Sequence, residues 1–106
     1  MACSEDYIGF ICEQISRYGV ITNRKMFGEY MIYINGKPII LVCDNIAYIK
    51  IKTEYEEYMT KADTNHPYNG AKEHYVLDVE DEELLAKVIP ILDDITPLPK
   101  PKKKKA

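Results

Sequence analysis

Hydrophobic residues recur along the first twenty positions with the spacing of one helical face. Four of them lie three or four residues apart, which is the repeat of an amphipathic helix: Ile8, Ile11, Ile15 and Tyr18. Ser4 precedes them as a favourable N-cap residue, and acidic residues follow in the first turn, where the helix dipole favours them. Gly19 is the expected stop. The pattern predicts a helix over residues 5–18.

The chain then changes to the two-residue period of β-strands. Asn35-Gly36 is the strongest two-residue hairpin signal, because both positions must take positive φ. Asp44-Asn45 marks a second tight turn. The segment of residues 20–23 is expected to be a short link. Around the turns we predict three strands that form an antiparallel meander with one buried face, over residues 30–34, 38–43 and 46–52.

The second half of the chain adds a fourth strand and a further helix. Thr53 and Glu56 have the spacing of a capping box, so a short helix is expected from Thr53 to about Ala62. Pro90 is expected to kink or split the last helix. The other predicted elements are a loop at 63–72, a strand at 74–79 and a helix at 80–95. Together these elements predict an α+β fold, in which the meander and a fourth strand form an antiparallel sheet packed with N-terminal and C-terminal helices.

Charge divides the chain into an acidic body and a basic end. The 106 residues include 14 basic and 17 acidic side chains, with five lysines near the C-terminus: Lys100, Lys102, Lys103, Lys104 and Lys105. Residues 1–99 therefore carry 9 basic against 17 acidic side chains, a net charge of −8. A body so acidic argues against a broad positive face for duplex DNA, which needs clustered Lys and Arg. We expect one domain at 1–96 and a tail without fixed structure at 97–106.

The sequence carries no catalytic, cofactor or metal signature. The three cysteines, Cys3, Cys12 and Cys43, do not form an even disulfide framework, and they are expected to be reduced thiols in a cytoplasmic protein. With His66 and His74 they show none of the spacings of structural zinc sites. No Gly-rich phosphate loop or serine nucleophile elbow is present. The longest apolar run, residues 39–43, is far short of a membrane span, so no membrane contact is expected.

Several short motifs in order resemble the TfoX/Sxy N-terminal domain family. They are Arg24-Lys25-Met26-Phe27-Gly28-Glu29-Tyr30, then Asn35-Gly36-Lys37, Leu41-Val42-Cys43-Asp44 and Tyr48-Ile49-Lys50. Glu29 departs from the family pattern, which has a second glycine there. The resemblance covers residues 5–95. It implies an α+β domain of regulatory character with no known catalytic activity, here expected to stand alone without the second domain of the competence regulators.

Arg24, Lys25 and Gly28 are candidate binding residues in the first of these motifs. A positive pair at the edge of the sheet could contact an acidic partner or a phosphate. The alternative is a solvated turn in which Arg24 pairs with an acid of the body, because surface ion pairs usually contribute little. Gly28 is expected to relieve a backbone constraint, either a bulge or a close helix approach.

Tyr48 and Lys50 are the other candidate binding residues, and Lys52 shares their predicted strand face. Aromatic and basic residues on an open sheet face bind single-stranded RNA in some proteins, by stacking and phosphate contact. The alternative is that a helix covers this face, or that tyrosine simply suits strands.

These observations favour a non-enzymatic cytoplasmic regulatory module that acts through contacts with another protein. The alternative is a nucleic-acid-associated accessory protein that uses the five tail lysines as a weak, non-specific tether. A small enzyme, with a cleft lined by the loop at 63–72, is the third class, and the missing catalytic motifs count against it.

Overall fold

The computed structural model describes residues 4–26 and 29–97. The elements in chain order are α1 (Glu5–Ile15), the 3-10 turn η1 (Ser16–Tyr18), β1 (Ile21–Met26), β2 (Glu29–Ile34), β3 (Lys37–Cys43), β4 (Ile46–Lys50), the 3-10 segment η2 (Thr53–Tyr58), β5 (Thr64–Asn65), β6 (His74–Val76) and α2 (Glu82–Ile95). The strands form one antiparallel sheet in the order β1-β2-β3-β4-β6-β5. The predicted α+β class is confirmed, with six strands where four were predicted.

The two additional strands come from segments predicted to be irregular. The link expected at residues 20–23 is wrong, since β1 pairs with the whole of β2, from Ile21 opposite Ile34 to Met26 opposite Glu29. The sequence of β1 lacks an apolar alternation because four successive residues are exposed at the edge of the sheet. An edge strand needs no buried face of its own. The loop at 63–72 begins with β5, a two-residue strand that pairs with β6.

The segment after β4 differs from the predicted helix. No side chain caps η2, so the capping box expected at Thr53 is wrong, and η2 ends at Tyr58 instead of Ala62. Tyr55 explains the difference, because its φ of −126° is non-helical while its side chain is fully buried. Its hydroxyl donates to the carbonyl oxygen of Lys50. Burial of one tyrosine therefore overrides the local helix signal.

Two strand ends also differ from the prediction, and the last helix is not split. The strand predicted over 46–52 ends at Lys50 as β4, and Ile51, which the prediction included, is 44% exposed. The fourth predicted strand ends at Val76. Pro90 does not split α2, which continues to Ile95 with the proline on its exposed side.

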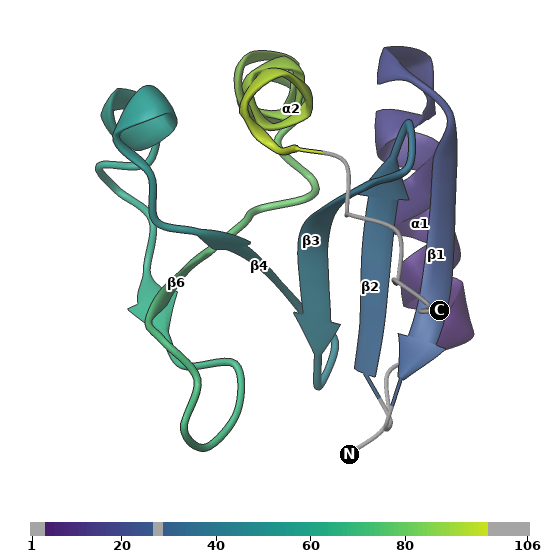
Figure 1. Ribbon diagram of the computed structural model, residues 1–106, viewed down its shortest axis with the longest axis horizontal. Helices are drawn as coiled ribbons and strands as arrows, with labels where there is room; N and C mark the ends of the chain where they lie inside the picture. The colour runs from purple at the N-terminus through teal and green to yellow at the C-terminus, as the bar shows by residue number, and fades with distance from the viewer. Residues whose placement is uncertain (1–3, 27–28, 98–106) are drawn as a thin grey trace, which may run out of the picture.

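α1 covers one face of the sheet. Figure 1 shows α1 behind β1 and β2, with α2 between η2 and the start of β3. Ser4 caps α1 as predicted, its Oγ accepting from the Tyr7 amide. The core between helices and sheet consists largely of fully buried aliphatic residues: Ile11, Ile15, Ile32, Ile40, Ile49, Val88 and Ile89.

Candidate functional site

The strand register places one row of side chains across the face of the sheet opposite α1. Arg24 pairs with Met31, Met31 with Leu41, Leu41 with Tyr48 and Tyr48 with Val76. Successive side chains of a strand point to opposite faces, so this row lies on the side away from Ile32, Ile40 and Ile49. We call the side with Arg24, Met31, Leu41, Tyr48 and Lys50 the open face, and the side packed by α1 the covered face.

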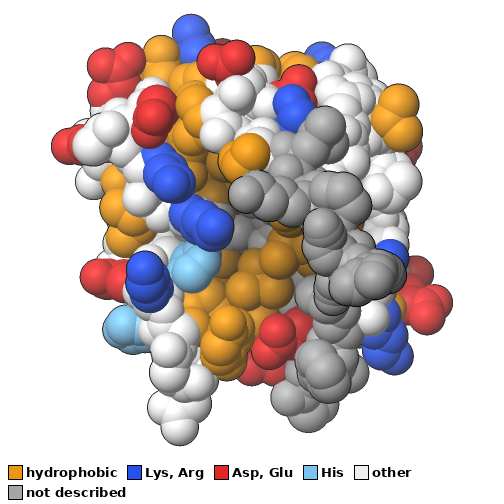
Figure 2. Space-filling model, viewed as in Figure 1, with side chains coloured by type: hydrophobic (Ala, Val, Ile, Leu, Met, Phe, Trp, Pro, Cys, Tyr) orange, Lys and Arg blue, Asp and Glu red, His pale blue; other side chains and the backbone are white. Residues whose placement is uncertain are grey.

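A shallow groove lies in the open face. Its volume is about 100 Å³, and residues of β2, β3, β4, β6, the segment after β4 and the end of α2 line it, among them Met31, Leu41, Tyr48, Lys50, Lys52 and His74. Figure 2, which views the molecule from the side opposite α1, shows Lys and His side chains beside a hollow of hydrophobic side chains. Pockets for drug-sized ligands typically measure about 300–1,000 Å³, so this groove suits a single side chain.

Basic side chains border the groove on one side. Lys50, Lys52 and His74 also line an adjoining, wider hollow of about 600 Å³, together with Lys72 and the half-exposed ring of Tyr68. We call Lys50, Lys52, Lys72 and His74 the basic rim. In the described part of the chain the ion pair observed is Lys37–Asp93, which lies outside the rim. No ion pair is therefore observed between the three rim lysines and an acid among the described residues.

The rim is held in place by local contacts. Nδ1 of His74 donates to the Lys72 carbonyl oxygen at 2.7 Å, and the imidazole meets the Tyr48 ring edge-on with a centroid distance of 6.5 Å. The carboxylate of Glu73, the acid nearest in sequence, accepts a hydrogen bond from the Thr64 hydroxyl. Glu73 also lines the wider hollow, so its negative charge lies near the rim lysines, although no ion pair with them is observed among the described residues.

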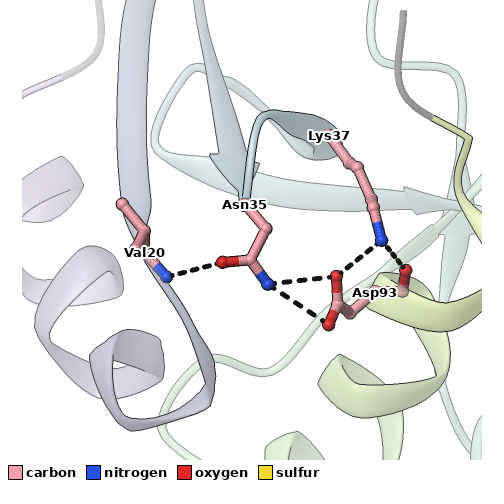
Figure 3. Close-up of polar contacts among 4 residues, drawn as sticks. All are labelled: Val20, Asn35, Lys37 and Asp93. Atoms are coloured by element: carbon pink, nitrogen blue, oxygen red, sulfur yellow. Dashed lines mark hydrogen bonds and ion pairs between the residues drawn. The ribbon is translucent and has the colours of Figure 1, made fainter.

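A polar clasp formed by Val20, Asn35, Lys37 and Asp93 joins the turn between β2 and β3 to α2 and to the residue before β1 (Figure 3). Asn35 Oδ1 accepts from the Val20 amide at 3.0 Å, and Nδ2 donates to both carboxylate oxygens of Asp93 at 3.3 Å. Lys37 Nζ contacts the Asp93 carboxylate at 3.0 Å and its carbonyl oxygen at 2.7 Å. The clasp ties the hairpin turn to the end of α2, where Ile95, Thr96 and Pro97 line the groove.

Gly19 lies in close contact with the clasp. A Cβ at this position would lie 2.8 Å from Asn35 Nδ2 and 2.9 Å from Ile34 Cγ1.

The two predicted hairpin turns are confirmed by positive φ at Asn35 and Gly36 (52° and 83°), and also at Asp44 and Asn45 (53° and 60°).

Two side chains that contact the sheet or belong to it, Cys12 and Tyr48, have raised pKa values. Burial raises the pKa of Cys12, and the hydrogen bond from Asn23 Nδ2 to its Sγ, at 3.6 Å, only partly opposes this. Burial also raises the pKa of Tyr48, with Cys43 and Asp44 adding to the effect. A raised pKa keeps thiol and phenol protonated, whereas a nucleophile or general base needs the opposite shift. Across residues 4–26 and 29–97, no cluster of His, Cys, Asp and Glu could hold a metal ion.

The structure brings together part of the predicted site. Arg24, Tyr48 and Lys50 share the open face, but Tyr48 is only 3% exposed and cannot serve as a stacking platform. Lys25 pairs with Tyr30 and so points to the other face. Gly28 and the five tail lysines lie outside the described residues.

Sequence reasoning missed four residues of this site: Met31, Leu41, Lys72 and His74. The first two had a usable signal, because the two hairpin turns fix a register that aligns them with Tyr48. The other two had none, since only the folded loop brings them beside β4.

The α+β fold, the antiparallel sheet and the apolar groove can be compared with those of known proteins. The family model of the TfoX N-terminal domain matches residues 13–89, and this chain belongs to that family. It is similar to a protein of Spirochaeta aurantia described as an uncharacterized 12.7 kDa protein in the trpE 5′ region, with 31% identity over 99% of this chain and 93% of the relative. No solved structure matches the chain.

Membrane insertion finds no support in the helices. Neither α1 nor α2, nor any other helix in the described ranges, is long and apolar enough to cross a bilayer.

Proposed function

We propose that this chain is a non-enzymatic regulatory module that binds another protein through the open face. The observation that supports this most is the row of Met31, Leu41 and Tyr48, whose first two side chains stay half-buried beside a groove. Contiguous apolar side chains rimmed by polar ones are typical of protein contact surfaces. The raised pKa values of Cys12 and Tyr48 and the small groove give no support to the enzyme alternative.

Affinity capture from extracts of cells that contain the protein tests this proposal. The bait is the full chain, compared with Leu41→Glu on the open face and with Phe10→Glu as a matched control, because Phe10 is 38% exposed on α1. We expect a specific partner that is retained by wild type and by Phe10→Glu and is lost with Leu41→Glu. Circular dichroism confirms that each variant is folded, and Met31→Lys serves as a second open-face variant. Identical captured proteins for all baits would contradict the proposal.

A second candidate is a nucleic-acid-associated accessory protein, favoured by the five lysines of the tail. Lysines that displace condensed counterions give an affinity that falls with salt, with a log–log slope of up to about −3 to −5 for five contacts. Titration of a labelled random oligonucleotide at two salt concentrations tests it, using the full chain and a variant with serine at the five tail positions. Equal binding by both proteins would exclude a tether in the tail.

A further inference from the structure

We infer that the open face binds an acidic segment of the partner protein, with one apolar side chain in the groove and a carboxylate on the basic rim. This inference rests on the proposed function and specifies the chemistry of the partner.

The size of the groove indicates one anchoring side chain. Its volume of about 100 Å³ is below the range of small-molecule pockets. Met31 and Leu41 line it and are only half-buried, so an aliphatic or aromatic side chain from outside would remove them from water. A small, partly apolar groove is the kind of pocket that interface anchors fill.

The charge of the rim indicates an acidic occupant. Lys50, Lys52 and Lys72 are three of the nine basic residues in a body of net charge −8, and each is exposed. The body as a whole has an excess of acidic residues, so the three lysines form a positive patch that is specific to this part of the surface. Complementary charges across an interface steer association and select the partner.

The same charge distribution favours a short acidic segment over a nucleic acid strand. A strand carries a phosphate at every nucleotide, so beyond the rim it would meet the acidic body. With Tyr48 buried, Tyr68 is the exposed tyrosine ring beside the rim, whereas strand binders stack successive bases on several aromatic side chains. A peptide can place its carboxylates at the rim alone.

The strand geometry gives the spacing of the recognised residues. Leu41, which lines the groove, is paired with Tyr48, and Lys50 follows Tyr48 by two positions on the same face, which corresponds to about 7 Å along the strand. An extended segment spans the same distance in two residues. The preferred segment therefore has an Asp or Glu two positions from a Leu, Ile, Met or Phe.

Selection from a random ten-residue peptide pool tests this, with the full chain as target. We expect the recovered peptides to carry the acid and the apolar residue at that spacing. Reversing the rim with Lys50→Glu and Lys52→Glu should weaken them about tenfold or more, because two ion pairs become two repulsions. Lys87→Glu, an exposed residue of α2, is the matched control and should change affinity less than about twofold. The reversed rim should in turn select basic peptides.

Each selection and each affinity measurement is repeated with serine at the five tail lysines. Binding of acidic peptides to the tail then cannot be mistaken for binding to the rim. Recovery of neutral or basic peptides by the wild-type chain, recovery of none, or affinities unchanged by rim reversal would overturn the inference. So would a single-stranded oligonucleotide that displaces the peptides only when the rim is intact. If recovered peptides lack acids but still lose affinity with Leu41→Glu, the inference fails while the proposed function stands. If neither peptide binding nor the capture of a partner protein is reduced by Leu41→Glu, the proposed function itself fails.

Discussion

The two faces of the sheet are built from alternate residues of the same strands, yet they have different environments. On the covered face Ile32, Ile40 and Ile49 are fully buried under the helices. On the open face their neighbours Met31 and Leu41 remain half-buried. The covered face therefore contributes most of its apolar area to folding, whereas the open face keeps apolar area that a partner can bury.

The largest effect that tests this comparison comes from adjacent residues of β3. Ile40→Ala should cost about 2–5 kcal/mol in the free energy of unfolding, because it leaves a cavity in the core. Leu41→Ala removes the same kind of side chain from the open face and should cost about 1 kcal/mol or less. Urea denaturation followed by circular dichroism measures both. Equal losses would show that the two faces are buried alike.

A second test compares two glycines near the N-terminus. Gly19→Ala should destabilise the protein by about 1–3 kcal/mol, because the new Cβ collides with Asn35 and loosens the clasp. Gly9→Ala should stabilise it by about 0.5–1 kcal/mol, since nothing lies within 4 Å of its Cβ position and alanine favours a helix. Thermal unfolding measures both values. A neutral Gly19→Ala would refute the tight approach at the clasp.

A third test uses the pH dependence of stability. Burial raises the pKa of Tyr55, with Tyr75 and Glu54 adding to the effect. Because the folded pKa lies above the unfolded value of about 10, its contribution is complete below pH 10 and is lost as pH rises above it. Tyr55→Phe should cost about 1 kcal/mol at neutral pH, through the lost hydrogen bond to Lys50, and should flatten the alkaline decline.

The control for Tyr55→Phe is Tyr68→Phe, at a residue that is 51% exposed. Urea denaturation from pH 8 to 10.5 should show the alkaline decline unchanged in this variant. A decline that is identical in all three proteins would mean that Tyr55 does not cause it.

The smallest effect is expected at Cys12, on α1 and remote from the open face. Cys12→Ala should leave peptide and partner binding unchanged and should alter stability by about 1 kcal/mol or less. In the wild type its raised pKa keeps the thiolate fraction low, so alkylation at pH 8 should be slower than for a cysteine in a short peptide. Loss of binding in folded Cys12→Ala would place function on the covered side.

Local signals predicted the elements that local chemistry controls. Asn35-Gly36 and Asp44-Asn45 set both hairpins, because their conformations need residues that tolerate positive φ. β1 could not be predicted, since most of its side chains are polar and show no apolar alternation. The strand is held by its backbone pairing with β2. The capping box at Thr53 failed because burial of Tyr55, a tertiary effect, outweighs it.

The candidate site likewise contains some residues that a local pattern places and others that only the tertiary structure places. Tyr48 and Lys50 lie two apart on β4, so a strand prediction already places them on one face. Lys72 and His74 join them only through the pairing of Lys50 with His74, which depends on the loop between β5 and β6. Arg24 reaches the same face through β1, which the polar sequence did not reveal.

The measurement that tests the central claim most directly is photo-crosslinking inside cells that contain the protein. Benzoylphenylalanine replaces either Tyr33, on the open face, or Phe10, exposed on α1, so that an aromatic ring is exchanged at each site. We predict a discrete protein adduct at position 33 that disappears when Leu41→Glu is added, and no such adduct at position 10. A protein adduct at position 10 with none at position 33 would contradict the account and place the contact surface on the α1 side.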